Sequence, residues 1–148
     1  MSTTAIDTSD REIVSIRVFD FPRERVFEAW TDPVLLAQWW GPKGFTNTFH
    51  VFESKAGGTW SFIMHGPDGT NYKNESIFVE VSPDRIVFDH VSAPHFRVTA
   101  TFEDLGGRTQ VTFRMLFNSA AECDRLRALC VPSNEENFDR LEALLNRK

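Results

Sequence analysis

The chain has 148 residues, of which 41% are hydrophobic, 25% charged and 13% aromatic, and its net charge is −5 at pH 7. This length and composition predict one globular domain and exclude a disordered chain. Nucleic-acid binding is excluded because Lys and Arg form no basic stripe, and a membrane span because no apolar run approaches roughly 20 residues.

The first ten residues, Met1 to Asp10, are polar and carry no signal-peptide core. The sequence therefore predicts a disordered N-terminal tail at residues 1–10, a single domain at residues 11–147 and a cytoplasmic location. The domain is expected to open with a strand at Glu12 to Phe19, where apolar and polar residues alternate and β-branched side chains are frequent.

Two short helices are expected in residues 22–40. Pro22 suits the start of the first helix, because its fixed φ fits a helix and its missing N–H leaves no donor unpaired. Asp32 before Pro33 repeats the start signal with a carboxylate N-cap, and the Gly41-Pro42 pair stops the second helix.

The apolar period then changes to two, which indicates strands. Six segments are predicted: Thr46 to Glu53, Thr59 to His65, Tyr72 to Val81, Arg85 to Val91, His95 to Phe102 and Thr109 to Phe117. Only short turns rich in Gly, Pro and Asp connect them. Because a parallel crossover needs a dozen or more residues, these strands are expected to form an antiparallel meander.

Helical spacing returns at the C-terminus and predicts a helical segment from about residue 119 to 146. Two capping boxes, Ser119 to Glu122 and Ser133 to Glu136, mark possible helix starts. Because Pro132 precedes the second box and lacks an N–H, the helix is expected to be interrupted near this residue.

The sequence predicts no cofactor, metal or disulfide. Cys123 and Cys130 are seven residues apart on the predicted helix, about 10 Å by the helical rise, which is beyond disulfide reach. No phosphate-binding or dinucleotide-binding loop is present. The four histidines match no zinc-binding spacing; they are His50, His65, His90 and His95.

Three stretches of the sequence carry a family resemblance: residues 19–33 (FDFPRERVFEAWTDP) with residues 38–42 (QWWGP), residues 57–69, and residues 79–87. They resemble the activator-of-heat-shock-protein-90-ATPase homologues of the START-type superfamily, also called SRPBCC or helix-grip. The resemblance covers residues 11–146. It implies an α+β helix-grip fold, in which a curved six- to seven-stranded antiparallel sheet surrounds a long C-terminal helix with two short helices after the first strand.

Rows of aromatic and sulfur-containing side chains indicate a function. Alternate residues of a strand face the same side, so Trp60, Phe62 and Met64 share one face of their strand. A strongly curved sheet holds its helix away and leaves a cavity lined by such rows. The sequence therefore predicts a domain that binds an apolar or aromatic small molecule between the sheet and the C-terminal helix.

Strand parity selects ten residues to line this cavity: Trp60, Phe62, Met64, Tyr72, Phe78, Phe88, His90, Phe96, Phe113 and Met115. Of these, His90 would place a titratable group on an apolar wall, because it shares parity with Ile86 and Phe88. No residue is singled out as catalytic.

Two other functions stay open at this stage. One is a co-chaperone-like protein-interaction module that binds its partner through Trp39 and Trp40, because consecutive helical residues cannot both face one core. The other is an enzyme of the polyketide cyclase type found elsewhere in the superfamily. It would need an acid or base in the cavity, for which the candidates are Glu75, Glu80, Asp89 and His90.

Overall fold

A computed structural model of the chain describes residues 9–147. A short 3-10 turn, η1 (Ser9–Arg11), leads into strand β1 (Glu12–Phe19), helix α1 (Arg23–Thr31) and helix α2 (Pro33–Trp39). Six further strands follow, and the helix α3 (Ala120–Asn146) ends the chain. The strands are β2 (Thr46–Phe52), β3 (Thr59–His65), β4 (Asn71–Ser82), β5 (Arg85–His90), β6 (Phe96–Asp104) and β7 (Thr109–Phe117).

The N-terminal tail differs in part from the prediction. Residues 1–8 of the predicted disordered tail lie outside the described residues. Ser9 and Asp10, by contrast, belong to the 3-10 turn η1, so the prediction of disorder was wrong for these two residues. The turn is held in place because the Arg11 guanidinium donates a hydrogen bond to the Phe117 carbonyl oxygen on β7, at 2.8 Å.

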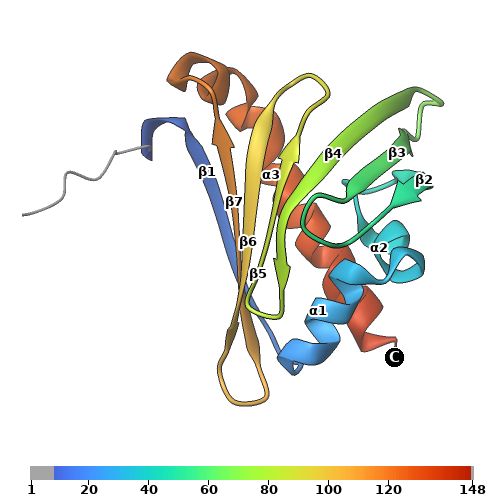
Figure 1. Cartoon of the computed structure of the whole chain (residues 1–148), viewed down its shortest axis with the longest axis vertical. Coiled ribbons are helices and arrows are strands. Elements are labelled where there is room, and N and C mark those ends of the chain that lie inside the picture. Colours follow the sequence, from blue (N-terminus) through green and yellow to red (C-terminus); the bar gives the residue numbers. More distant parts are fainter. Residues whose placement is uncertain (1–8, 148) are drawn as a thin grey trace, which may run out of the picture.

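The seven strands form one antiparallel sheet in the order β1-β7-β6-β5-β4-β3-β2. Strands β2 to β7 are a meander, each paired with its sequence neighbour, and β1 joins the far side of β7. The antiparallel meander predicted from the short turns and the helix-grip fold implied by the family resemblance are therefore confirmed (Figure 1).

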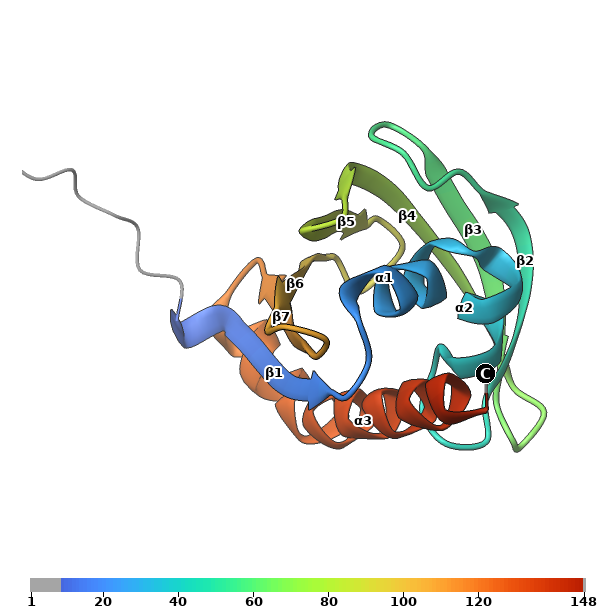
Figure 2. The ribbon, with the colours of Figure 1, turned by 90° about the horizontal axis from the view of Figure 1, so that it is seen from below.

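The sheet curves around the helices, and Figure 2 shows α3 lying across its open side with α1 and α2 inside the curve. Two register shifts interrupt the pairing, one between Phe49 and Val51 on β2 and one between Phe78 and Glu80 on β4. Such bulges bend a strand and increase its twist. They lie on the half of the sheet that curves most strongly over the helices, which holds β2 to β4 away from β1 and β7.

Helix α3 packs against the sheet mainly through its second half. Phe138, Leu141 and Leu145 are buried in the core there, whereas Leu129 in the first half is 64% exposed. Between Cys123 and Asn134, no residue of the helix is fully buried. The first half contacts the core through fewer side chains, those of Cys123, Leu126 and Cys130.

The predicted interruption of this helix near Pro132 is wrong. Helix α3 runs without a break from Ala120 to Asn146 with Pro132 inside it, and Ser119 caps its start by accepting a hydrogen bond from the Glu122 N–H. A proline removes one backbone hydrogen bond but leaves the rest of the helix intact where the surrounding turns are held by packing. The second capping box, Ser133 to Glu136, is thus not used as a helix start.

Candidate functional site

A cavity of about 130 Å³ lies between the concave face of the sheet and α3. Its walls are mostly apolar and come from β3 to β7, the end of α2 and the middle of α3. The lining residues are Trp40, Trp60, Phe62, Met64, Asn74, Ser76, Phe88, His90, Phe96, Val98, Phe113, Met115, Asn134 and Asn137. We call this space the inner cavity.

Eight of the ten residues that strand parity selects line the inner cavity, and Phe78 and Tyr72 do not. Phe78 lies deeper in the core, where its ring stacks on Trp60 at 6.1 Å between centroids. Tyr72 lies beyond the reach of the helix and is 46% exposed, with its ring 6.0 Å from that of Phe45. Parity gives the face of a strand correctly, but not how far along the strand the helix covers it.

Six lining residues are absent from the sequence-based selection: Trp40, Asn74, Ser76, Val98, Asn134 and Asn137. Asn74, Ser76 and Val98 share parity with selected residues on β4 and β6, so the same rule could have found them. Asn134 is a polar residue on the apolar face of α3 that also carries Phe138. A buried amide at such a position is a signal of a site, because it must be paired.

Trp40 contradicts the predicted exposed tryptophan surface. Trp39 is 1% exposed, and Trp40 also turns inward, with its ring 5.1 Å from that of Trp60 and 6.2 Å from that of Phe113. Trp40 is the C-cap of α2 and has extended backbone angles, φ −68° and ψ 134°. Because the chain leaves the helix there, both side chains can face the core, and the prediction of a partner surface at Trp39 and Trp40 was wrong.

Helix α3 holds the segment that carries Trp40. The Arg140 guanidinium donates hydrogen bonds to five carbonyl oxygens at the end of α2 and in the loop after it, those of Gln38, Trp40, Gly41, Pro42 and Phe45. The side-chain oxygen of Asn137 accepts a further bond from the Gly41 N–H at 2.7 Å. Burial lowers the pKa of Arg140. The loop and one wall of the inner cavity are thus fixed to α3 by polar contacts.

His90 is the titratable residue of the inner cavity. Its Nδ1 lies 2.8 Å from the Pro94 carbonyl oxygen and its Nε2 lies 2.7 Å from Oδ1 of Asn74. The ring stacks on Phe96 at 4.5 Å between centroids. Burial lowers the pKa of His90 more than its hydrogen bonds to Pro94 and Ser92 raise it. The Pro94 contact requires the proton on Nδ1, so in the neutral ring Nε2 is an acceptor and pairs with Asn74 only when the NH2 end of that amide faces the ring.

Two buried polar atoms of the lining have no hydrogen-bond partner in the protein. These are Oγ of Ser76 and the indole Nε1 of Trp60. The amide nitrogen of Asn134, by contrast, donates to Oγ of Ser15 at 3.3 Å and contacts the sulfur of Met115 at 3.5 Å. The inner cavity is therefore apolar in most of its walls, and the polar side chains of its lining come from β4, β5 and α3.

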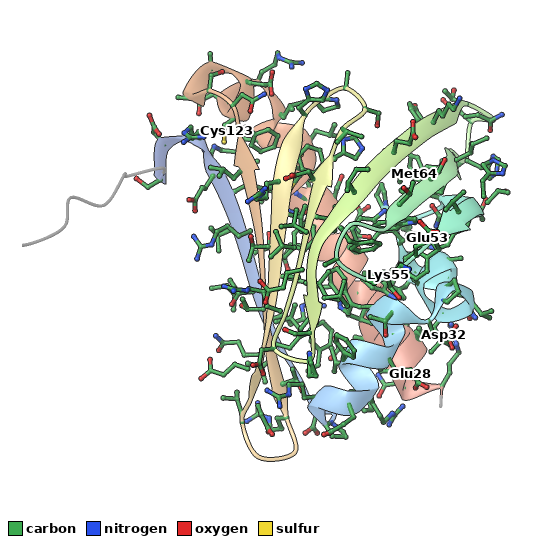
Figure 3. The ribbon with its side chains drawn as sticks, in the orientation of Figure 1. Glu28, Asp32, Glu53, Lys55, Met64 and Cys123 are labelled. Carbon is green, nitrogen blue, oxygen red and sulfur yellow. The ribbon has the colours of Figure 1, made fainter. Side chains whose placement is uncertain are left out.

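A wider hollow of about 540 Å³, which we call the outer groove, lies at the surface beside the inner cavity. The two spaces share Met64, Asn74 and His90, so these side chains lie where the two spaces adjoin. Figure 3 marks Met64 on β3. The remaining lining of the groove comes from the loop after α2, the start of β4, the loop before β6 and α3, and consists of Pro42, Phe45, Asn71, Tyr72, Lys73, Ala93, Pro94 and Leu129.

The other acid–base candidates lie outside the inner cavity. Asp89 binds Arg97 through two hydrogen bonds of 2.7 and 3.0 Å, and Glu80 pairs with Arg85 at 3.0 Å. Glu75 is exposed. Of the four residues considered for catalysis, only His90 therefore lines the space where a ligand could lie.

Neither cysteine lines the inner cavity or the outer groove. Both are free thiols on α3, and Figure 3 shows Cys123 near the start of that helix. Burial raises the pKa of the Cys130 thiol, which keeps it protonated and weakly nucleophilic. Within residues 9–147, no group of three or more His, Cys, Asp or Glu side chains could hold a metal ion. Of the helices described, none has both the length and the apolar character to cross a membrane.

Solved structures share this fold over nearly the whole chain. A protein from Arthrobacter aurescens is 25% identical, with a TM-score of 0.87, and the match covers 99% of this chain and 92% of that one. A protein from Nitrosomonas europaea is 20% identical, with a TM-score of 0.87 and coverage of 96% and 97%. The AHSA1 protein from Silicibacter pomeroyi is 19% identical, with a TM-score of 0.75 and coverage of 92% and 98%.

Sequence comparison identifies the family. Among curated proteins none matches this chain. The family described as "Activator of Hsp90 ATPase homolog 1-like protein" matches residues 20–146, which include α1, α2, β2 to β7 and all of α3. The resemblance predicted from the opening signature and the two later stretches is thereby confirmed. The chain belongs to this SRPBCC-type family, whose members commonly bind ligands.

Proposed function

We propose that the protein binds an apolar or aromatic small molecule in the inner cavity. The observation that carries this proposal is a space of about 130 Å³, walled mostly by apolar side chains, between the core of the sheet and α3. Protein interiors contain few voids larger than a water molecule. An apolar cavity of roughly 150 Å³ takes up benzene, so the inner cavity has the size of one aromatic ring.

The walls of the inner cavity suit a flat apolar ligand. Trp40, Trp60, Phe88 and Phe113 meet one another mostly edge to face, which is a favourable arrangement for aromatic rings. A ligand ring placed among them leaves water and contacts protein rings. Each Å² of apolar surface removed from water favours this transfer by about 25 cal/mol. The outer groove supplies an entry path past Met64 and leaves room for a substituent of the ligand.

Binding without catalysis is the function that these side chains support best. A cyclase-type reaction needs an acid and a base at the ligand, and His90 is the only one of the four candidates in the lining. The two nitrogens of this imidazole already contact protein oxygens, so neither is free to exchange a proton with a ligand. We place this ligand-binding protein in the cytoplasm as part of the same proposal.

Filling the inner cavity tests the proposal. Ser76→Phe adds a benzyl-sized group at a residue that lines the cavity, and Ser61→Phe adds the same group on the opposite face of the sheet. A panel of single-ring aromatic and short acyl compounds would be titrated by calorimetry, with melting temperature as a second measure. Wild type and Ser61→Phe are expected to bind members of the panel, and Ser76→Phe to lose that binding while keeping its circular dichroism spectrum.

Two results would contradict the proposal. One is that no compound of the panel binds wild type or raises its melting temperature. The other is that Ser76→Phe, correctly folded, binds the same compounds as well as Ser61→Phe does. In either case the ligand-binding function would be abandoned for this cavity.

A further inference from the structure

We infer that the inner cavity recognises a single aromatic ring that carries one uncharged hydroxyl group, the chemical class of the phenols. The inference rests on the proposed function and specifies the chemical class of the ligand. It comes from two asparagine side chains of α3, Asn134 and Asn137, each of which has one end of its amide held by the protein and the other end without a partner.

Asn134 places a hydrogen-bond acceptor in the wall of the inner cavity. Its side-chain nitrogen donates to Oγ of Ser15 at 3.3 Å and lies 3.5 Å from the sulfur of Met115. A thioether sulfur only accepts, so the nitrogen and not the oxygen of the amide faces it. Within residues 9–147, Oδ1 of Asn134 has no hydrogen-bond partner, yet it is not one of the unpartnered atoms that protein covers completely.

The accessible surface of this oxygen faces an internal space. Asn134 is only 6% exposed, and it lines both the inner cavity and a recess of about 10 Å³ beside that cavity. An acceptor that is neither paired nor fully covered, on a side chain buried from the outside, is a group that a ligand in the cavity can satisfy.

Asn137 presents the opposite hydrogen-bonding group. Its oxygen accepts from the Gly41 N–H at 2.7 Å, which fixes the orientation of the amide, because a backbone N–H needs an acceptor. The NH2 group has no partner in the part of the chain that the structure describes, and it too keeps some accessible surface. Asn137 lines the same two spaces as Asn134. One wall of the inner cavity therefore carries a free acceptor and a free donor.

The spacing of the two asparagines suits one hydroxyl group. Residues three apart lie on the same face of a helix, with about 5 to 6 Å between their Cβ atoms. Two hydrogen bonds through one oxygen join groups about 4.5 to 5.5 Å apart. A hydroxyl can make both bonds, because it donates to the oxygen of Asn134 and accepts from the NH2 group of Asn137. A carbonyl or ether oxygen could pair with Asn137 alone.

The charge and size of the lining limit the ligand further. No Lys, Arg, Asp or Glu lines the inner cavity, so an ionised substituent would be desolvated without a partner of opposite charge. A phenol has a pKa of about 10, as in tyrosine, and is therefore neutral at pH 7. The inner cavity has room for one ring, and the recess beside the asparagines for about one water-sized group.

Phenol and toluene test the inference, because they have nearly the same shape and differ only in a hydroxyl and a methyl group. Calorimetry is expected to show that wild type binds phenol at least as tightly as toluene, although an apolar cavity without polar partners would favour toluene. Asn134→Leu, similar in size but without the amide, is expected to weaken phenol relative to toluene by about tenfold. The control Asn118→Leu should leave this ratio unchanged, because Asn118 is exposed and lines neither the inner cavity nor the outer groove.

The side-chain NH2 resonances of Asn137 give a second readout, in wild-type protein, that does not depend on the folding of a variant. They are expected to move downfield with phenol and much less with toluene, because only phenol accepts a hydrogen bond. Tighter binding of toluene than of phenol to wild type, an unchanged ratio in folded Asn134→Leu, or equal NH2 shifts with both ligands would overturn the inference and leave the proposed binding function standing. If neither ligand nor any other single-ring aromatic binds, the proposed function fails together with it.

Discussion

At the scale of single residues, His90 connects the stability of the protein to pH. Burial lowers the pKa of its imidazole, so the folded protein holds the ring neutral in a range where the unfolded chain, with a usual value of about 6.5, begins to bind a proton. A group whose pKa is lower in the folded state contributes stability above the unfolded value. That stability is lost as the pH falls from about 6.5 toward the pKa of the folded state.

The free energy of unfolding should therefore decrease between pH 7.5 and pH 5 by more in wild type than in His90→Gln, which cannot titrate. Urea denaturation at several pH values measures this difference. His50→Gln is the matched control for the loss of a histidine, because His50 is exposed on β2, a strand that does not pair with β5. Equal pH dependence in wild type and His90→Gln would show that burial does not hold His90 neutral.

Two phenylalanines distinguish an open cavity from a filled core. Phe113 is 5% exposed and lines the inner cavity, whereas Phe102 is 2% exposed and packs against the rings of Phe27 and Trp30 at 6.0 and 5.7 Å. Phe102→Ala should cost about 3 to 5 kcal/mol, as for a close-packed site. Phe113→Ala should cost less, because few contacts are lost on the open side. Chemical denaturation measures both, and an equal cost would indicate a filled cavity.

Residue-level prediction from the sequence succeeded where a simple period governs the side chain. The side chains of Trp60 and Phe62 had to share one face of β3, and those of Phe88 and His90 one face of β5, because strands alternate with period two. The inward turn of Trp40 could not be predicted in this way. It depends on where α2 ends and on Arg140, which lies 100 residues later in the chain.

At the scale of elements, the strands were well determined by their turns. β1, β3 and β7 have the predicted bounds, because each is limited by turn residues that cannot continue a strand. Helix α3 is the element for which a local rule failed. The penalty for Pro132 is real, but the packing of Phe138, Leu141 and Leu145 holds the helix that follows it. Here tertiary packing outweighs the helix-breaking effect of the proline, and such packing cannot be predicted from the local sequence.

Replacing Pro132 tests this explanation. The residue is exposed, so Pro132→Ala removes no core contact, restores a backbone N–H and removes a clash with the preceding turn. We expect the substitution to raise the free energy of unfolding by about 1 to 3 kcal/mol, the range by which alanine exceeds proline inside a helix. Thermal and urea denaturation measure the gain. An unchanged or lower stability would mean that the proline is already accommodated without cost.

At the scale of the whole molecule, the inner cavity results from two features that act together. The bulges on β2 and β4 bend these strands, and α3 faces the space with two asparagines, Asn134 and Asn137, in place of bulky apolar side chains. Composition indicated an excess of aromatic side chains but could not decide whether they fill the interior or surround a space. That decision depends on curvature and on helix placement, both of which arise from contacts distant in the sequence.

The measurement that tests this account most directly is the detection of nuclear Overhauser effects between a bound single-ring ligand and the methyl groups of Met64 and Met115. Met115 lines the inner cavity alone, whereas Met64 lines both the inner cavity and the outer groove. With a single-ring compound of the panel that binds, effects to both methyl groups are expected, because its ring would lie among side chains from β3 and β7. Effects confined to Tyr72 and Leu129 in the outer groove, or no effects at saturating ligand, would contradict a ligand-binding cavity between the sheet and α3.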